Sequence, residues 1–212
     1  MRTMPYAIRT ERLHLRCWDP RDAEGLLAVS EANRGHLSPW IPAKYHEPQT
    51  IEEKVDLLRE FRGRFDLGED FVYGIFDEAS GSIVGGSGLH LRHGPGVADV
   101  GYWLVQDAVG KGYATEAAGA VVRAGFEFLE LARIEIRCDP ENPPSRRVAE
   151  ALGFQHEATL RGIYPAPSGS RIDTEVHGML RAGIASSPVG ERTVTFADAI
   201  GRPVEERAAG RG

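Results

Sequence analysis

The stretch VGKGYATEA, from Val109 to Ala117, restricts the fold more than any other part of this sequence. It places Gly110 and Gly112 around a lysine and then continues into residues that favour a helix. The run DVGYWLV just before it has the pattern of a strand. A strand, a glycine loop and a helix in this order build an anion site, because unpaired amides and the positive end of the helix dipole point to one place.

Two common nucleotide-binding patterns do not fit this loop. A P-loop requires G-x-x-x-x-G-K-[ST], but Val105 stands in place of the first glycine and Gly112 in place of Ser or Thr. A dinucleotide loop requires G-x-G-x-x-G, but Thr115 stands in place of the third glycine and no βαβ unit opens the chain. Two alternatives remain: a pyrophosphate held by main-chain amides, or a glycine turn that serves only tight packing.

The rest of the chain alternates strand and helix patterns. We expect strands near residues 12–18, 70–77, 82–91, 98–105, 133–138, 154–161 and 174–180, and helices near 20–33, 51–65, 113–130 and 142–153. This order predicts an α/β (α+β) fold, in which a mixed sheet carries helices on both faces. Residues 36–42 form an irregular loop in this interpretation. We predict one domain over residues 1–185 and a mobile tail over 186–212, which is rich in Gly, Pro and charge.

Composition excludes several classes of protein. The formal net charge of −6 argues against a general nucleic-acid binder and favours cationic substrates such as amines. No apolar run approaches the ~18 residues of a membrane span, and the N-terminus lacks a signal-peptide core, so a cytoplasmic location is expected. Cys17 and Cys138 are too few for a disulfide framework and lack the spacing of metal ligands.

Several motifs together carry a family resemblance. VGKGYATEA resembles the acetyl-CoA loop of the GNAT acetyltransferase superfamily, Q/R-x-x-G-x-G/A: Gly112 and Ala114 match, and Val109 stands where Gln or Arg is usual. DVGYWL, IEIRCDPENPPSRRVAEALGF, HLSPWIP and RGIYPAPSGSRIDTEVHGML resemble segments of the ribosomal-protein N-terminal acetyltransferases (RimJ/RimL type), over about Ile8 to Leu180. The resemblance implies a mostly antiparallel sheet of six or seven strands, about four helices and a splayed central strand pair.

The resemblance also implies acetyl-CoA as cosubstrate, with its pantetheine arm between the splayed strands. Arg146 and Arg147 either reach its phosphates or form an ordinary solvated pair, and no metal is implied. The residues expected to contact acetyl-CoA are Trp103, Leu104, Val105, Gly110, Lys111, Gly112, Tyr113, Ala114, Thr115 and Asn142.

Two residues are the catalytic candidates that this resemblance implies. Ser145 matches the serine of N-x-x-S, which protonates the leaving thiolate in relatives, although Asn142 and Ser145 also suit a helix N-terminus. Asp99 stands where relatives commonly carry a Glu base. Its side chain is one methylene shorter than Glu, so a water relay is expected. The alternative is that Asp99 is only a charged residue at the start of a strand. His90 and His93 are alternative bases or surface histidines.

The acceptor is expected to be a primary amine. At pH 7, deprotonation costs about 1.4 kcal/mol for an α-amine and about 4.6 kcal/mol for a lysine side chain. The weak candidate base therefore favours a protein N-terminus, of ribosomal-protein type by resemblance. The alternatives are a small amine, such as a polyamine, amino sugar or amino acid, and a catalytically silent acyl-CoA-binding module.

A homodimer is expected from the resemblance alone. The residues that line the acceptor groove, or else belong to the core, are Trp40, Tyr73, Trp103 and Tyr164.

Overall fold

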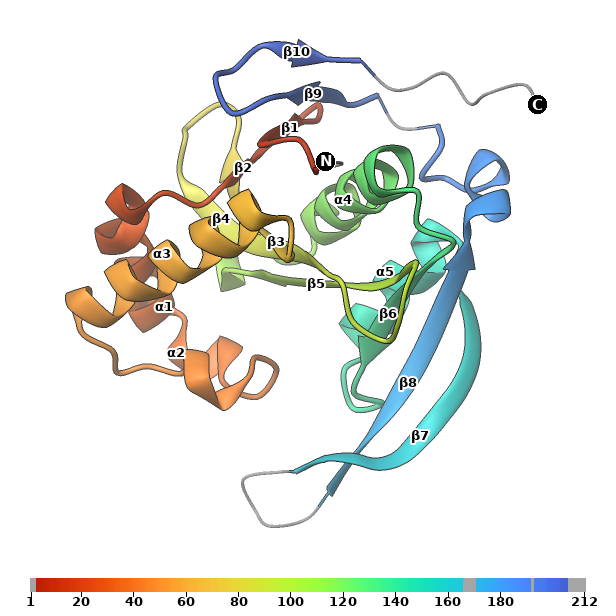
Figure 1. Cartoon of the computed structure of the whole chain (residues 1–212). Helices are drawn as coiled ribbons and strands as arrows, with labels where there is room; N and C mark the ends of the chain where they lie inside the picture. The colour runs from red at the N-terminus through yellow and green to blue at the C-terminus, as the bar shows by residue number, and fades with distance from the viewer. Residues whose placement is uncertain (1–2, 166–170, 192, 206–212) are drawn as a thin grey trace.

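A computed structural model describes residues 3–165, 171–191 and 193–205 of the chain. Their strands form one sheet in the order β10-β9-β1-β2-β3-β4-β5-β6-β8-β7 (Figure 1). Only β5 and β6 run parallel, so the predicted mixed, mostly antiparallel sheet is confirmed. The strands are β1 Ala7–Arg9, β2 Leu13–Cys17, β3 Asp70–Asp77, β4 Ile83–His90, β5 Val97–Leu104, β6 Arg133–Cys138, β7 Gln155–Pro165, β8 Arg171–Leu180, β9 Thr195–Ala197 and β10 Pro203–Val204.

Helices cover both faces of this sheet. The main helices α1 and α3 lie on one side, and α4 and α5 lie on the other (Figure 1). No helix in the described ranges is long and apolar enough to cross a bilayer. The α-helices are α1 Ala23–Ala32, α2 Arg34–Leu37, α3 Ile51–Leu67, α4 Tyr113–Leu129 and α5 Pro143–Leu152, and 3₁₀ turns cover Pro20–Asp22, Ala43–Tyr45, Gln106–Ala108 and Arg181–Ser186.

Local capping signals set the ends of the helices. The Thr50 side chain accepts from the Glu53 amide while the Glu53 side chain accepts from Thr50, which is the predicted capping box at the start of α3. Asn142 caps α5, and Gly153 ends it in the left-handed conformation, also as predicted. The loop expected at residues 36–42 is partly helical, because α2 extends to Leu37 before Pro39 stops it.

The central pair of strands opens into a V. Strands β5 and β6 pair only at Val97, Ala98 and Asp99, opposite residues 133–135. Beyond Asp99, β5 stays paired with β4 while β6 stays paired with β8. Residues 100–104 therefore present one unpaired edge towards the gap, and the predicted splayed pair is confirmed.

The sheet extends past the boundary predicted at residue 185. Strand β9 pairs with β1, and the Phe196 ring packs 5.1 Å from the Phe128 ring of α4. The prediction of a mobile tail is therefore wrong for β9 and β10, and the sheet of the described residues has ten strands instead of six or seven. These strands and β1 have only two or three residues each, too few for alternation to be visible in the sequence. Residues 206–212 lie outside the described ranges.

Candidate active site

The glycine loop before α4 is shaped for an anion. Gly110 and Gly112 have φ angles of 79° and 81°, a region that side chains with a Cβ rarely adopt. No described residue accepts a hydrogen bond from the amides of residues 110–112. The amides of Tyr113, Ala114 and Thr115 open α4 and have no intrahelical acceptor. A row of main-chain donors thus lies at the positive end of the α4 dipole.

An ion pair between the partly exposed Arg12 and the buried Glu116 holds this loop in place, and sequence reasoning missed it. The Arg12 guanidinium donates to Glu116 Oε2 at 2.8 Å and to the Lys111 carbonyl at 2.9 Å. The Thr10 hydroxyl donates to the other Glu116 oxygen at 2.6 Å. Burial raises the pKa of Glu116, but the bonds from Thr10 and Arg12 outweigh burial and lower it, so the carboxylate stays charged. Arg12 and Glu116 are 104 residues apart, and nothing local in the sequence links them.

The free edge of β5 differs from the prediction in detail. The Val105 amide donates to the Val84 carbonyl at 2.9 Å, so it is engaged with the β4 side of the sheet. Successive residues of a strand turn their main-chain N–H and C=O groups to opposite edges, so the main chain of Trp103 also faces β4. The main chains of Leu104 and Tyr102 face the V. Of the three β5 residues predicted to contact the pantetheine arm, only Leu104 turns its main chain towards the V, and Tyr102, which was not among them, does so too.

Ser145 lies at the N-terminus of α5, next to the V. Its hydroxyl and the Tyr102 hydroxyl share a hydrogen bond at 3.0 Å, and the Tyr102 hydroxyl also lies 3.2 Å from the Ser145 carbonyl oxygen. Burial raises the pKa of Tyr102 more than the Ser145 bond lowers it, so the phenol keeps its proton. The Ser145 amide donates to Asn142 Oδ1 at 3.3 Å, which is the helix cap. Tyr102 thus links the open edge of β5 to the candidate acid.

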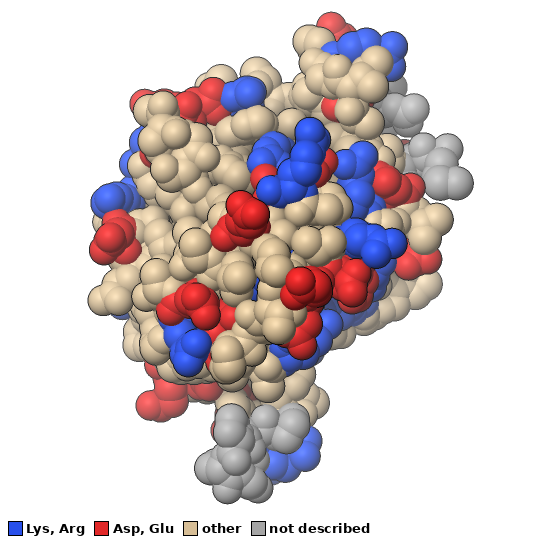
Figure 2. Space-filling view, turned by 90° about the vertical axis from the view of Figure 1, so that its left-hand side faces the viewer, with Lys and Arg blue, Asp and Glu red and all other residues tan. Residues whose placement is uncertain are grey.

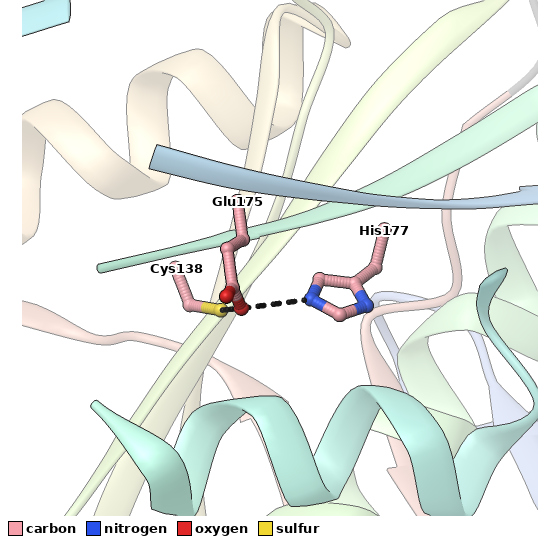
Figure 3. A group of neighbouring side chains, drawn as sticks. All are labelled: Cys138, Glu175 and His177. Carbon is pink, nitrogen blue, oxygen red and sulfur yellow. Dashed lines mark hydrogen bonds and ion pairs between the residues drawn. The ribbon is translucent and has the colours of Figure 1, made fainter. Parts of the chain in front are cut away.

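A buried polar cluster lies where β6 ends (Figure 3). Glu175 Oε2 lies 3.3 Å from His177 Nε2 and 3.9 Å from Cys138 Sγ, and in the described ranges no other such group of three or more metal-type ligands occurs. Arg146 already donates to Glu175 Oε2 at 2.9 Å and balances its charge. Burial raises the pKa of Cys138 to about 11, so its sulfur is a thiol and a poor ligand. The cluster is therefore best explained by hydrogen bonding, and Arg146 is turned towards Glu175 instead of a phosphate.

The structure places Asp99 at the closed end of the V. It is the last β5 residue paired with β6, opposite Glu135. Its Oδ1 lies 3.3 Å from Arg92 Nε and 3.2 Å from His93 Nε2, at ion-pair distance from Arg92 but without hydrogen-bond geometry to either side chain. His90 stands beside Asp99 in the β4–β5 register. The predicted base is thus held in an ion-pair cluster next to the gap.

The four aromatic residues expected at the acceptor groove lie in different surroundings. Tyr73 is fully buried and donates to the Pro5 carbonyl at 2.7 Å, so it belongs to the core. Trp103 packs over Gly86, on the face of the sheet that carries α1 and α3. Trp40 and Tyr164 are exposed.

Comparison with known proteins agrees with this geometry. Residues 12–155 match the acetyltransferase (GNAT) domain family. An uncharacterised N-acetyltransferase of Bacillus licheniformis is 34% identical over 176 residues, 81% of this chain and 94% of that protein. The [ribosomal protein uS5]-alanine N-acetyltransferase of Escherichia coli is 28% identical over 155 residues, 71% of this chain and 78% of that protein.

A solved structure extends the match to the fold. Mycobacterium smegmatis RimJ in complex with CoA-disulfide superposes with a TM-score of 0.79 at 26% identity, covering 88% of this chain and 92% of that one. The unpaired amides of the glycine loop fit a pyrophosphate, and the free edge of β5 fits the amides of a pantetheine arm. The chain belongs to the GNAT acetyltransferase family, is an N-acetyltransferase, and uses acetyl-CoA as its cosubstrate.

Proposed function

We propose that this protein acetylates the N-terminal α-amine of a protein, with a ribosomal protein as acceptor. The observation that carries the proposal is the similarity, over 71% of the chain, to an enzyme named [ribosomal protein uS5]-alanine N-acetyltransferase. The outer face that carries α1 and α3 shows acidic and basic side chains interspersed, without a large field of one sign (Figure 2).

In this proposal the glycine loop and β5 hold acetyl-CoA. The amides of residues 110–115 contact the pyrophosphate, and the main chain of Leu104 and Tyr102 contacts the pantetheine arm. Asn142 uses its Oδ1 for the helix cap and has its side-chain amide left for the arm. Ser145 protonates the sulfur that leaves when the amine attacks the thioester, because its hydroxyl adjoins the V.

The preference for an α-amine follows from the cost of deprotonation. An amine must be neutral before it can attack. At pH 7 deprotonation costs about 3 kcal/mol more for a lysine side chain than for an α-amine. Asp99, at ion-pair distance from Arg92, is a poor group to close that gap. An acceptor that is already partly neutral at pH 7 therefore suits this site.

A competition experiment tests the proposal. A peptide with N-terminal alanine and one internal lysine is incubated with acetyl-CoA, and the product is mapped by mass spectrometry. Polyamines, amino sugars and amino acids are assayed in parallel, and an acetyl-blocked peptide is the control. We expect modification at the N-terminus. Modification mainly at the lysine would contradict the proposal, and turnover of a small amine without any peptide would reassign the acceptor.

The homodimer and the cytoplasmic location remain predictions. Analytical ultracentrifugation at micromolar concentration measures the first directly. A single species at the 23.2 kDa of one chain would contradict it.

A further inference from the structure

His90 is held above the start of the V by a charged partner. Its Nδ1 lies 2.6 Å from Asp70 Oδ1, and Asp70 Oδ2 lies 3.3 Å from the Arg64 guanidinium of α3. The contact with a carboxylate fixes Nδ1 as the donor and leaves Nε2 as the acceptor when the ring is neutral. No described residue hydrogen-bonds to Nε2, and the His90 side chain is 20% exposed.

Gly88 makes room for this ring, and Gly101 lies in ordinary contact distance of it. A methyl group on Gly88 would lie 2.9 Å from Nε2, so no larger residue fits there without moving the ring. A methyl group on Gly101 would lie 3.7 Å from Nε2. Gly101 is two residues beyond Asp99, on the part of β5 that has left β6. Nε2 therefore lies over the first open segment of the V.

Gly101 leaves this face of β5 without a side chain next to His90. Asp99, Gly101 and Trp103 project from this face, and the glycine leaves a space between the carboxylate and the indole. Protonation of Asp99 would break its ion pair with Arg92, whereas Nε2 has no hydrogen-bond partner among the described residues. Of these two groups, the imidazole can therefore take a proton without losing an ion pair.

We propose that His90 Nε2 accepts the proton of the acceptor amine, and that Asp70 positions the ring. The inference rests on the proposed acetyl transfer but not on which amine is acetylated. The amine nitrogen bonds to the acetyl carbon and gives a proton to Nε2 while the C–S bond breaks. The sulfur takes a proton from the Ser145 hydroxyl, which regains one from water, and the imidazolium returns its proton to water.

Several charged groups surround this ring and contribute to its pH response. Asp70 contacts the ring directly, and ion pairs lie on either side of it. The titratable and charged residues that face His90 or its partners are Arg64 on α3, Asp70 on β3, Arg92 and His93 after β4, Asp99 on β5, and Glu135 with Arg133 and Arg137 on β6.

The test uses the full chain and the amine that the wild type acetylates best. His90→Asn keeps a donor towards Asp70 and removes Nε2. We expect kcat to fall about 100-fold, since a general base contributes about 10²–10⁴-fold. The acidic limb of the pH–rate profile near neutrality should vanish, added imidazole should restore part of the rate, and CoA binding measured by calorimetry should be unchanged. His156→Asn, an exposed histidine on β7, is the matched control with wild-type turnover.

The variant Asp70→Asn tests whether Asp70 positions the His90 ring. We expect a smaller loss in kcat than in His90→Asn, with unchanged KM, because the ring keeps Nε2 but loses the carboxylate that fixes its orientation. Wild-type rate and pH profile in His90→Asn, or the loss of the limb in Asp99→Asn instead, would overturn the assignment. A wild type that acetylates only a small amine would defeat the proposed acceptor while leaving this test intact. One that acetylates no amine would defeat both.

Discussion

Ser145 occupies a position where catalysis and helix capping compete for the same side chain. Its amide completes the Asn142 cap, whereas its hydroxyl faces Tyr102. Only the hydroxyl is lost in Ser145→Ala, so the cap remains. We expect kcat to fall at least tenfold with little change in acetyl-CoA binding, because protonation of the thiolate matters in the transition state. Steady-state kinetics and calorimetry measure the two effects separately.

Tyr102→Phe is the companion variant at this site. It keeps the ring and removes the hydroxyl that contacts Ser145. We expect an intermediate loss of kcat and a stability loss of about 1 kcal/mol, the usual net value of one hydrogen bond. A lower melting temperature with normal turnover in both variants would show that the pair serves only the helix.

Gly112 supplies a backbone conformation and an open surface at once. Gly112→Val would strain a residue at φ 81° and cover amides that are expected to contact the pyrophosphate. Gly201, at φ 82° in the turn between β9 and β10, offers the same strain far from the loop. We expect Gly112→Val to weaken CoA binding at least tenfold and Gly201→Val to leave it unchanged. Equal CoA affinity of the two variants in calorimetry would contradict the loop as the phosphate site.

At the scale of elements, a buried ion pair fastens the segment before α3. Lys54 Nζ lies 2.6 Å from Glu47 Oε1, and both side chains are 2% exposed. Glu47→Gln would leave the lysine without its charge partner, and we expect a loss of about 3 kcal/mol in unfolding free energy. The matched control is Asp56→Asn, which removes an exposed pair with Arg59 and should cost less than about 1 kcal/mol. Urea denaturation measures both, and equal losses would contradict the importance of burial.

Elements with a local signal could be predicted from sequence, and elements that depend on distant partners could not. The capping box at Thr50 and the Asn142 and Gly153 caps mark α3 and α5 within a few residues of chain. Strands β1, β9 and β10 are too short to carry a pattern and gain their stability from pairing with one another.

The same distinction separates the predicted and the missed parts of the site. The glycine loop is local and was predicted. Long-range contacts such as Arg12 with Glu116 and Tyr102 with Ser145 required the fold. The direction of each β5 amide also depends on the register with β4, which the sequence of β5 alone does not contain.

At the scale of the whole molecule, the last strands are part of the fold. Phe196 is 5% exposed and packs against Phe128, whereas Ile200, four residues later, is 75% exposed. Phe196→Ala should lower the unfolding free energy by about 3 kcal/mol, as for other buried phenylalanines, and Ile200→Ala should change it by less than about 0.5 kcal/mol. Thermal denaturation measures both variants. A wild-type melting temperature for Phe196→Ala would show that β9 is not stably docked.

Stability should decline on the alkaline side because several buried groups keep their protons in the folded protein. Burial raises the pKa of Cys17 and of Tyr6 to about 12, with a bond to Asp66 adding to the shift at Tyr6. Burial also raises the pKa of Tyr73 well above its usual range. In the unfolded chain a thiol ionises near pH 8.5 and a phenol near pH 10.

The sign of the effect follows from counting protons. Between about pH 9 and 12 the unfolded chain has lost protons that the folded protein still binds, so the free energy of unfolding falls as pH rises. Below about pH 8 both states hold these protons, and this contribution to stability is complete. Urea denaturation from pH 8 to 11 measures the slope. Cys17→Ala removes one of the groups and should make the decline shallower. Unchanged stability up to pH 11 would mean that the groups ionise in the folded protein as readily as in the unfolded chain.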